Sequence, residues 1–393
     1  MWESQRISKR SGKGGKPALW LSMLSTPRHF HRACLASRIS FFVGLWNTEG
    51  TCGVKDDGGV AVSKASRFAL FLAIGSLCGF HLVAQQDKSP HKAQLVTAEE
   101  GVELEVLDWG GSGSPMVFLG GSDAHVFDDF APKFTESHHV YGISQQGFGK
   151  SSAPEPTATN YTSDHLADGF LAVLSRLNIN RPVLVGHSQA GEILSSIGSR
   201  DPQRVAGLIY LDGGYAYAFY SSAIGDIAID AVDEQHQLDL FLAKGFQDPQ
   251  QIEKLKTGAA RLQRDLERIE RTVSLQPPRP SDAPPIPPIG LALSRGHQKY
   301  THIDVPVLAI YADPHSFGPL YRNDPDKLAA LVADDKATVS AQADAFQAGV
   351  PSAQVIRIPN ADHFIFRSNE AEVIRDMNAF IAKLPGQHAA DDK

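Results

Sequence analysis

The sequence predicts an α/β fold, a mostly parallel sheet of eight strands flanked by helices, with a helical lid inserted between strands six and seven. Three observations support this prediction. From Gln94 onward, short apolar runs alternate with helical patterns. The 393 residues are 42% hydrophobic and 21% charged, so the chain can bury a large core. One interval, residues 214–300, breaks the alternation and indicates an insertion.

Eight strands are expected in chain order. The first lies near Leu95, and Val102–Trp109 alternates like an exposed antiparallel edge strand before a glycine-rich turn. Six further runs have the length and composition of buried parallel strands. They are Met116–Leu119, Val140–Ile143, Pro182–Val185, Ala206–Leu211, Val307–Tyr311 and Gln354–Ile358. Helical patterns between them cover residues near 161–177, 189–200, 323–348 and 369–384.

The insertion at 214–300 contains a helical run, Gln250–Arg271, followed by the proline-rich stretch Pro277–Pro288. Proline-rich linkers are stiff, and long insertions in compact domains are usually functional. We expect a lid over the strand ends, with a simple surface excursion as the alternative. Residues 85–213 and 301–393 would then form the core domain.

The first 84 residues are expected to lie outside the fold. In 62–84, Lys64 and Arg67 precede the apolar run Phe68–Leu77, the pattern of a secretory signal peptide. The run is shorter than the roughly 20 residues of a spanning helix, although an uncleaved anchor is the alternative. Residues 1–61 are interpreted as a non-native or disordered extension upstream of the true start. The expected location is periplasmic or secreted, in a bacterial cell, without stable membrane insertion after signal removal.

Charge and cysteine are both distributed unevenly. Residues 1–84 hold 11 of the 37 Lys and Arg and 4 of the 44 Asp and Glu, which leaves 26 basic and 40 acidic side chains in 85–393, a net of −14. An acidic body repels polyphosphate and argues against nucleic-acid binding. Cys34, Cys52 and Cys78 all precede residue 85, which excludes a cysteine nucleophile, a cysteine-ligated zinc and a disulfide in the body.

The strand PVLV runs directly into Gly186-His187-Ser188-Gln189-Ala190-Gly191, and a helix former follows. A strand–turn–helix of this kind presents its serine on a sharp, strained elbow, where small residues are needed on either side. Ser188 is therefore the candidate nucleophile. The alternative is a serine that caps a helix N-terminus.

A serine hydroxyl becomes a good nucleophile only when a neighbouring base removes its proton. His363 is the candidate base, because it follows the last predicted strand and precedes the last helix, in the order nucleophile, acid, histidine. Two carboxylates at strand ends are candidates for the acid that orients His363. Asp212 ends LIYL, and Asp313 follows VLAIYA. The sequence leaves both open, since Asp at a strand end is also a common turn former.

Acyl transfer also needs donors aimed at the developing oxyanion. The backbone N–H of Gln189, directly after the nucleophile, is one candidate. The other is the loop after VFL, where Gly121 lets the backbone approach the substrate and the N–H of Ser122 is expected to point inward. An ordinary glycine turn is the alternative for this loop.

With these residues in view, residues 94–385 resemble the α/β-hydrolase superfamily. The matching stretches are VFLGGSDAHVFDDFAPKF, VYGISQQGFGKSSAP, VLVGHSQAGE, RVAGLIYLDGGY, VPVLAIYAD and IPNADHFIFRSNEAEV. The resemblance implies ester hydrolysis through an acyl-enzyme on Ser188, with no metal or organic cofactor. Serine at this position argues against the branches similar to haloalkane dehalogenases and epoxide hydrolases, which use aspartate.

The sequence departs from the family pattern at three places. Ala190 replaces a glycine of the elbow, and Gln145-Gln146 stand where many relatives carry a charged pair. The acid in related sequences usually follows the seventh strand by about three residues, where this chain has His315. Some family members supply the acid from the position of Asp212 instead.

Aromatic residues open the insertion and are expected to line an acyl pocket for a small-molecule ester. They are Tyr215, Tyr217, Phe219 and Tyr220. Packing of lid against body is the alternative. Other chemistry of the same residues, such as lactone, C–C or peptide hydrolysis or perhydrolysis, stays open. A non-catalytic ligand-binding protein is the alternative of a different class. The substrate and the oligomeric state are not predicted.

Overall fold

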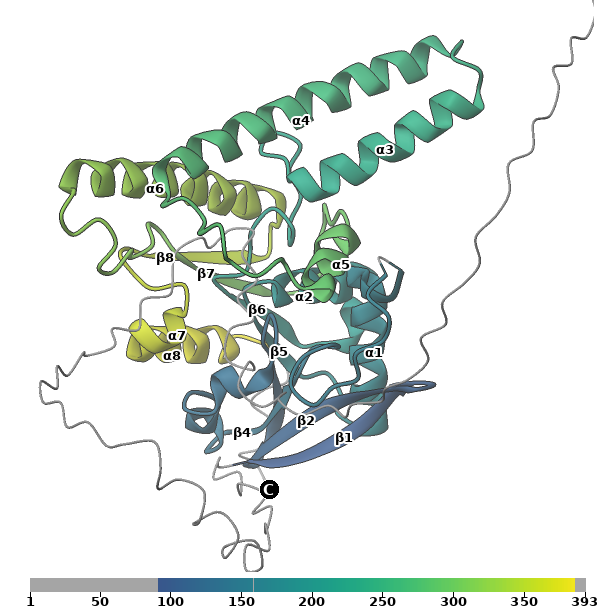
Figure 1. Cartoon of the computed structure of the whole chain (residues 1–393). Coiled ribbons are helices and arrows are strands. Elements are labelled where there is room, and N and C mark those ends of the chain that lie inside the picture. The colour runs from purple at the N-terminus through teal and green to yellow at the C-terminus, as the bar shows by residue number, and fades with distance from the viewer. Residues whose placement is uncertain (1–90, 158, 386–393) are drawn as a thin grey trace, which may run out of the picture. The chain divides into compact units, whose positions relative to one another are not determined.

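The computed structural model describes residues 91–157 and 159–385 (Figure 1). The predictions for 1–61 and for the signal peptide at 62–84 lie outside these residues. Within the described ranges, no helix combines the length and the apolar character needed to cross a membrane.

One sheet of eight strands organises the described part of the chain, with the order β1-β2-β4-β3-β5-β6-β7-β8. β1 pairs antiparallel with β2, β2 pairs antiparallel with β4, and every later pairing is parallel. The predicted fold class is confirmed. The bounds are β1 Lys92–Glu99, β2 Val102–Gly110, β3 Ser114–Leu119, β4 His138–Ile143, β5 Val183–His187, β6 Gly207–Leu211, β7 Val307–Ala312 and β8 Ala353–Ile358.

The prediction that Val102–Trp109 forms the edge of the sheet is wrong. This segment is β2, which pairs on both sides, and β1 is the edge strand. β2 is correspondingly buried along most of its length. β1 exposes six of its eight residues and buries only Val96 and Ala98. The antiparallel direction was predicted correctly.

Helices cover both faces of the sheet and bury a hydrophobic core on each (Figure 1). Successive strand residues alternate between the two cores, so Val117 and Leu184 pack with α1 and α2, whereas Phe118 and Val185 pack with α8. The bounds are α1 Ser163–Arg176, α2 Ala190–Arg200, α6 Pro325–Gly349, α7 Ile365–Ser368 and α8 Glu370–Ile381, with 3₁₀ turns at Ala124–Phe127, Ala131–Phe134, Thr159–Tyr161 and Pro202–Arg204.

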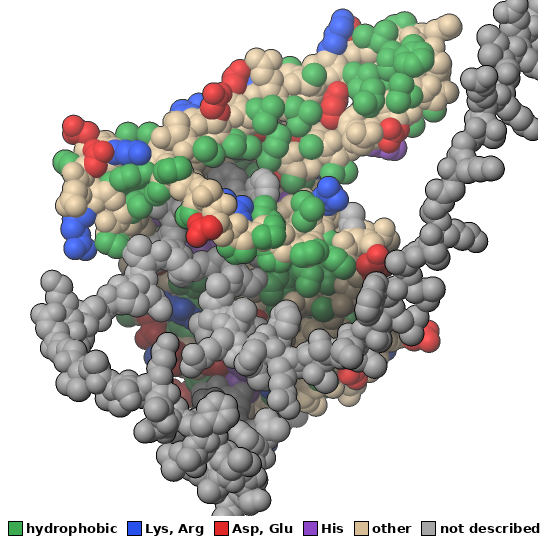
Figure 2. All heavy atoms as spheres, viewed as in Figure 1, with side chains coloured by type: hydrophobic (Ala, Val, Ile, Leu, Met, Phe, Trp, Pro, Cys, Tyr) green, Lys and Arg blue, Asp and Glu red, His purple; other side chains and the backbone are tan. Residues whose placement is uncertain are grey.

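The insertion between β6 and β7 is helical. α3 (Ile227–Ala243) and α4 (Pro249–Leu275) form a hairpin, and α5 (Pro288–Gly296) follows the proline-rich stretch. α4 contains the predicted helical run, while α3 and α5 were not predicted. Figure 2 shows hydrophobic side chains on the hairpin surface, and its exposed residues near the turn include Leu238, Leu242 and Phe246.

The sheet topology places several loops at one edge. The chain leaves β3 to one side for β4 and returns past it to β5, so the carboxyl ends of β3 and β5 flank a topological switch point, where α/β proteins bind ligands. β6, β7 and β8 continue in parallel with their ends level, since Leu211 pairs with His187 and with Ile310, and Ala312 pairs with Ile358. The loops that follow these strands therefore meet at one edge.

Candidate active site

Ser188 occupies a strained turn between β5 and α2. Its φ of 56° lies in the left-handed region, which is costly for a residue with a Cβ. The turn packs tightly against the loop after β6, because a Cβ at Gly191 would lie 1.9 Å from the carbonyl oxygen of Gly213. The side chain of Ala190 is fully buried, so the smallest Cβ is accommodated there. Ser188 itself is partly exposed.

His363 lies in the loop between β8 and α7, facing Ser188. Its Nε2 is 3.0 Å from Oγ of Ser188. The loop is held by two backbone hydrogen bonds to the loop after β7, from Asn360 N–H to the Pro314 carbonyl and from Ser316 N–H to the Ala361 carbonyl. The two loops therefore position one another, and His363 is fixed by both.

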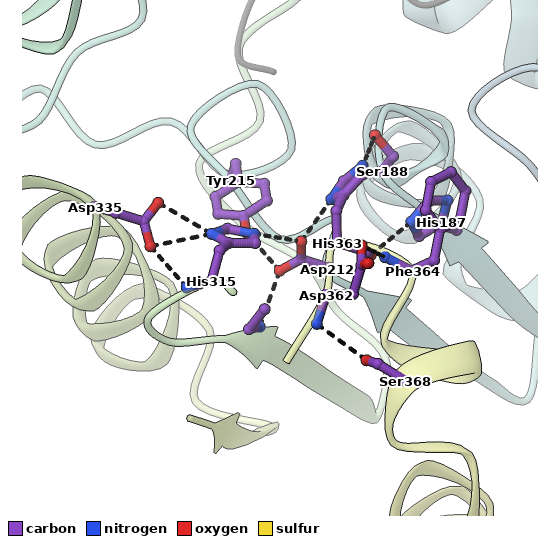
Figure 3. A network of polar contacts seen from close by, with 11 residues as sticks. His187, Ser188, Asp212, Tyr215, His315, Asp335, Asp362, His363, Phe364 and Ser368 are labelled. Atoms are coloured by element: carbon purple, nitrogen blue, oxygen red, sulfur yellow. Dashed lines mark hydrogen bonds and ion pairs between the residues drawn. The ribbon is translucent and has the colours of Figure 1, made fainter. Parts of the chain in front are cut away.

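Asp212 is the carboxylate that contacts His363. Its Oδ2 is 2.6 Å from Nδ1 of His363, and its side chain is completely buried (Figure 3). Asp212 follows β6 directly and also has a positive φ, 45°, which turns its side chain back toward the elbow. An Nδ1–H donated to Asp212 leaves the lone pair of Nε2 directed at the Ser188 hydroxyl.

Asp313, the other candidate acid, lies elsewhere. It accepts hydrogen bonds from Ser340 at 2.8 and 3.0 Å and lies 3.6 Å from the Arg357 guanidinium. No contact joins Asp313 to His363 among the described residues. The two alternatives that the sequence left open are thus separated by geometry, which brings Asp212 and not Asp313 to the histidine.

The Asp212 carboxylate accepts more hydrogen bonds than the one from His363. Oδ2 also faces Nε2 of His315 at 2.8 Å, while Oδ1 accepts from the Tyr215 hydroxyl at 2.5 Å and from the Ala312 N–H at 3.0 Å. Burial alone would raise the pKa of Asp212, but His315 and His363 outweigh it and hold the pKa well below its usual range. Asp212 is therefore ionised at neutral pH.

His187 was not predicted to contribute, yet it supports the site. Its Nε2 donates to the backbone carbonyl of His363 at 2.9 Å, and its ring is buried beside Phe364. Burial lowers the pKa of His187 to about 3, and the nearby His363 acts in the same direction. The ring is therefore a neutral support for the His363 loop. In the sequence, the only sign of this supporting role is that His187 directly precedes Ser188.

The loop after β3 lies against the elbow. A Cβ at Gly121 would lie 3.1 Å from the backbone nitrogen of Gln189 and 3.4 Å from Cβ of Ser188. Among the described residues, no hydrogen bond takes the backbone N–H of Gln189 or of Ser122. The first turn of α2 also directs its N-terminal dipole toward Ser188, which favours negative charge there. The arrangement can stabilise an oxyanion at Ser188.

Gln145 helps to fix this loop. Its backbone N–H donates to the Ser122 carbonyl at 2.9 Å, and its side-chain amide is buried with no hydrogen-bond partner among the described residues. The amide borders a cavity of about 10 Å³ that Gly120 and Ile193 also line, a volume near that of one water molecule. Gln146 instead donates to the Asn160 carbonyl at 2.9 Å.

The four aromatic residues predicted to line a pocket divide into two pairs. The Tyr215 hydroxyl donates to Asp212, and the Tyr217 side chain lies near Asp212 and Ser188. Burial raises the pKa of Tyr217, the Asp212 carboxylate adds to the effect, and the Ser188 hydroxyl opposes it. Its ring centroid lies 5.8 Å from that of His297.

The other pair does not reach the nucleophile. Phe219 packs against Phe346 of α6, with ring centroids 5.6 Å apart. The Tyr220 hydroxyl donates to Asp230 of α3 at 2.6 Å. These contacts fit the alternative for Phe219 and Tyr220, packing of the insertion against the body.

Within residues 91–157 and 159–385, two groups of side chains have ligand types that could hold a metal. One consists of Asp212, His315 and His363, whose contacts are described above. The other consists of His91, His125 and Asp128, in which both histidines face the Asp128 carboxylate, at 2.8 and 3.1 Å. Hydrogen bonds to Asp128 and then to Glu105 raise the pKa of His125 to about 10. The His125 ring lies 3.1 Å from Asp128 and 3.5 Å from Glu105, and these ion pairs account for its contacts.

Comparison with known proteins finds similar stretches in several of them. Over 96 residues, 24% of this chain and 16% of the relative, the sequence is 35% identical to a probable oxidoreductase, EphD, of Mycobacterium tuberculosis. Over 100 residues, 24% of this chain and 35% of the relative, it is 29% identical to the bifunctional esterase/perhydrolase DCH of Acinetobacter calcoaceticus. The aligned stretches thus span well under half of these relatives.

Among solved structures, E-2-(acetamidomethylene)succinate hydrolase aligns with 74% of this chain and 99% of its own, at 17% identity and a TM-score of 0.46. The family model described as the alpha/beta hydrolase fold matches residues 115–370, which include the elbow, Asp212 and His363. The chain belongs to the α/β-hydrolase family.

Proposed function

We propose that this protein is a serine hydrolase that cleaves carboxylic esters through an acyl-enzyme on Ser188. His363 is the general base, and Asp212 is the acid that orients it. The observation that carries the proposal is the unbroken series of contacts from Oγ of Ser188 to Nε2 of His363, 3.0 Å, and from Nδ1 to Oδ2 of Asp212, 2.6 Å. Nucleophile and base lie within hydrogen-bonding reach, and a third group fixes the base.

In the acylation step, Oγ of Ser188 bonds to the ester carbonyl carbon while Nε2 of His363 takes the hydroxyl proton. The carbonyl oxygen becomes an oxyanion next to the N–H groups of Gln189 and Ser122. The C–O bond to the alcohol then breaks, and the alcohol leaves with the proton from Nε2.

Deacylation repeats the sequence with water. The water oxygen bonds to the acyl carbon as His363 takes its proton, and Ser188 leaves as a hydroxyl when that proton returns. The product is a carboxylic acid, and the buried Asp212 carboxylate stabilises the imidazolium form of His363 in both steps.

Turnover of p-nitrophenyl esters from acetate to decanoate tests the proposal. We expect Ser188→Ala to reduce kcat by at least about 10³-fold, the usual loss for a triad nucleophile. Ser340→Ala is the matched control, because Ser340 contacts Asp313 and not the triad. A folded Ser188→Ala protein with wild-type turnover would refute the proposal.

We further propose that the insertion is a lid whose base borders the acyl pocket. Three contacts support this: α5 approaches Gly147 through Ile289, His297 lies beside Tyr217, and α4 is bound to α6 where Arg271 and Thr272 contact Asp334. The double variant Arg271→Ala/Thr272→Ala removes the last tie. It should change KM for long esters and leave kcat for acetate within about twofold. Equal KM values across all chain lengths would contradict a lid.

Export to the periplasm or medium, with cleavage before Gln85, is proposed from the sequence pattern of residues 62–84. N-terminal sequencing of the native protein tests it. A mature N-terminus near Gln85 is expected, whereas any native peptide from residues 1–59 would refute the idea that the extension is non-native.

A further inference from the structure

We propose that His315 is a positioning residue of the triad, a permanent cation that orients the Asp212 carboxylate and moderates its charge toward His363. The proposal rests on the function proposed above for Ser188 and His363. It also gives a role to the position after the seventh strand, where the family resemblance leads one to expect an acid and this chain has a histidine.

Both ring nitrogens of His315 face carboxylates. Nε2 is 2.8 Å from Oδ2 of Asp212, and Nδ1 is 3.0 Å from Oδ1 of Asp335 on α6 (Figure 3). A neutral imidazole has one N–H and one lone pair, and its lone pair would then point at a carboxylate oxygen. Two carboxylate partners therefore require two N–H groups, which is the cationic form.

The same conclusion follows from the electrostatics of the site. Burial lowers the pKa of His315, but the Asp212 and Asp335 carboxylates outweigh burial and raise the pKa to about 11. The backbone N–H of His315 also donates to Oδ2 of Asp335 at 2.7 Å, so side chain and backbone are held by one carboxylate. His315 therefore keeps its charge over the pH range in which a serine hydrolase works.

His315 completes the coordination of Asp212. Oδ2 accepts from His363 and His315, and Oδ1 accepts from Tyr215 and the Ala312 N–H. A carboxylate offers about four lone-pair sites, so all are used. Rotation of the carboxylate away from His363 would break several of these bonds at once, and His315 is thus part of what holds Oδ2 in place.

The charge of His315 also acts on His363 directly. The groups that face His315 are Asp212 after β6, Asp335 from α6, the Tyr215 hydroxyl at 3.3 Å and the His363 ring, whose centroid is 6.2 Å away. A cation at that separation weakens the pull of the Asp212 carboxylate on positive charge at the His363 ring, while the Asp335 carboxylate partly offsets the cation.

The test compares kcat and KM of His315→Gln with those of wild type. Loss of the ring that holds Oδ2 of Asp212 should lower kcat by about 10-fold and leave KM within about twofold, because the ring contacts the proposed acid and not the substrate. His139→Gln, which removes an ion pair to Asp108 at the start of β4, should leave both constants unchanged. A His315→Gln protein with wild-type kcat, or one whose KM rises as much as its kcat falls, overturns the proposal.

A second measurement does not depend on turnover. In protein labelled with ¹⁵N at histidine, the His315 ring should give imidazolium shifts from pH 6 to pH 9, assigned by their loss in His315→Gln. A His315 ring that titrates near pH 6.5 overturns the proposal even if the enzyme is active. Conversely, a wild type that hydrolyses no ester refutes the proposed function, while the charge of His315 is still decided by these spectra.

Discussion

Asp212→Asn removes the charge of the proposed acid with little change in size. Asn offers one acceptor oxygen where Asp212 accepts four hydrogen bonds, so an amide N–H₂ must face either the two imidazoles or the Tyr215 and Ala312 donors. If the amide turns N–H₂ toward His363, the ring must accept at Nδ1 and carry its proton on Nε2. His363 could then no longer act as a base toward Ser188.

The magnitude follows from the charge. The imidazolium of His363 and the Asp212 carboxylate, with Nδ1 and Oδ2 2.6 Å apart, have charge centres separated by about 4 Å. At an effective dielectric constant near 20 this attraction is about 4 kcal/mol, equivalent to about 10³-fold in rate. The wrong tautomer adds to the loss, so we expect kcat to fall by about 10³- to 10⁴-fold.

The assay is steady-state hydrolysis of p-nitrophenyl acetate, with circular dichroism and thermal unfolding to show that the variant is folded. Asp313→Asn is the matched control, since Asp313 also follows a strand and contacts Ser340 and Arg357 instead of His363. We expect its kcat within about threefold of wild type. A folded Asp212→Asn protein within tenfold of wild type, or an equal loss in Asp313→Asn, would refute the assignment of the acid.

Three further outcomes are expected. His187→Phe removes the N–H that the His363 carbonyl accepts and should cost about 1–3 kcal/mol of unfolding free energy together with about 10- to 100-fold in kcat, with partial recovery in His187→Gln; wild-type kcat would contradict a support role. Tyr217→Ala should change the preferred ester chain length in a panel from acetate to decanoate, and an unaltered profile would count against its place in the pocket. The charged His315 ring should stabilise the fold fully below about pH 6.5, its pKa in the unfolded chain, and this stabilisation should be lost as the pH rises toward its folded pKa of about 11. Tm should therefore fall more steeply between pH 7 and pH 10 in wild type than in His315→Gln, and parallel curves would contradict the cationic form.

The parallel strands could be predicted because strands buried on both faces are short, continuous apolar runs. α4 was predicted from its one-sided apolar pattern, whereas α3 was not, because its apolar side chains are distributed around the helix and most of them stay exposed. The edge was misassigned because β2 keeps an alternating polar pattern although it pairs on both sides.

Ser188 and His363 could be placed from local context, because an elbow and a loop after the last strand are short-range features. The acid could not, since Asp212 and Asp313 both end strands whose ends are level at one edge of the sheet. Which of the two faces His363 depends on the turn that each makes after its strand, and Asp212 turns with φ of 45°. The contact of His315 with Asp335, 20 residues away on α6, has no sequence pattern of its own.

Mass spectrometry of the protein after reaction with a fluorophosphonate probe tests the central claim most directly. We predict one adduct per chain, on the peptide that contains Ser188, with no adduct in Ser188→Ala and slow labelling in His363→Gln. A folded wild-type protein that takes up no probe, or carries it on another residue, would contradict an activated hydroxyl at position 188.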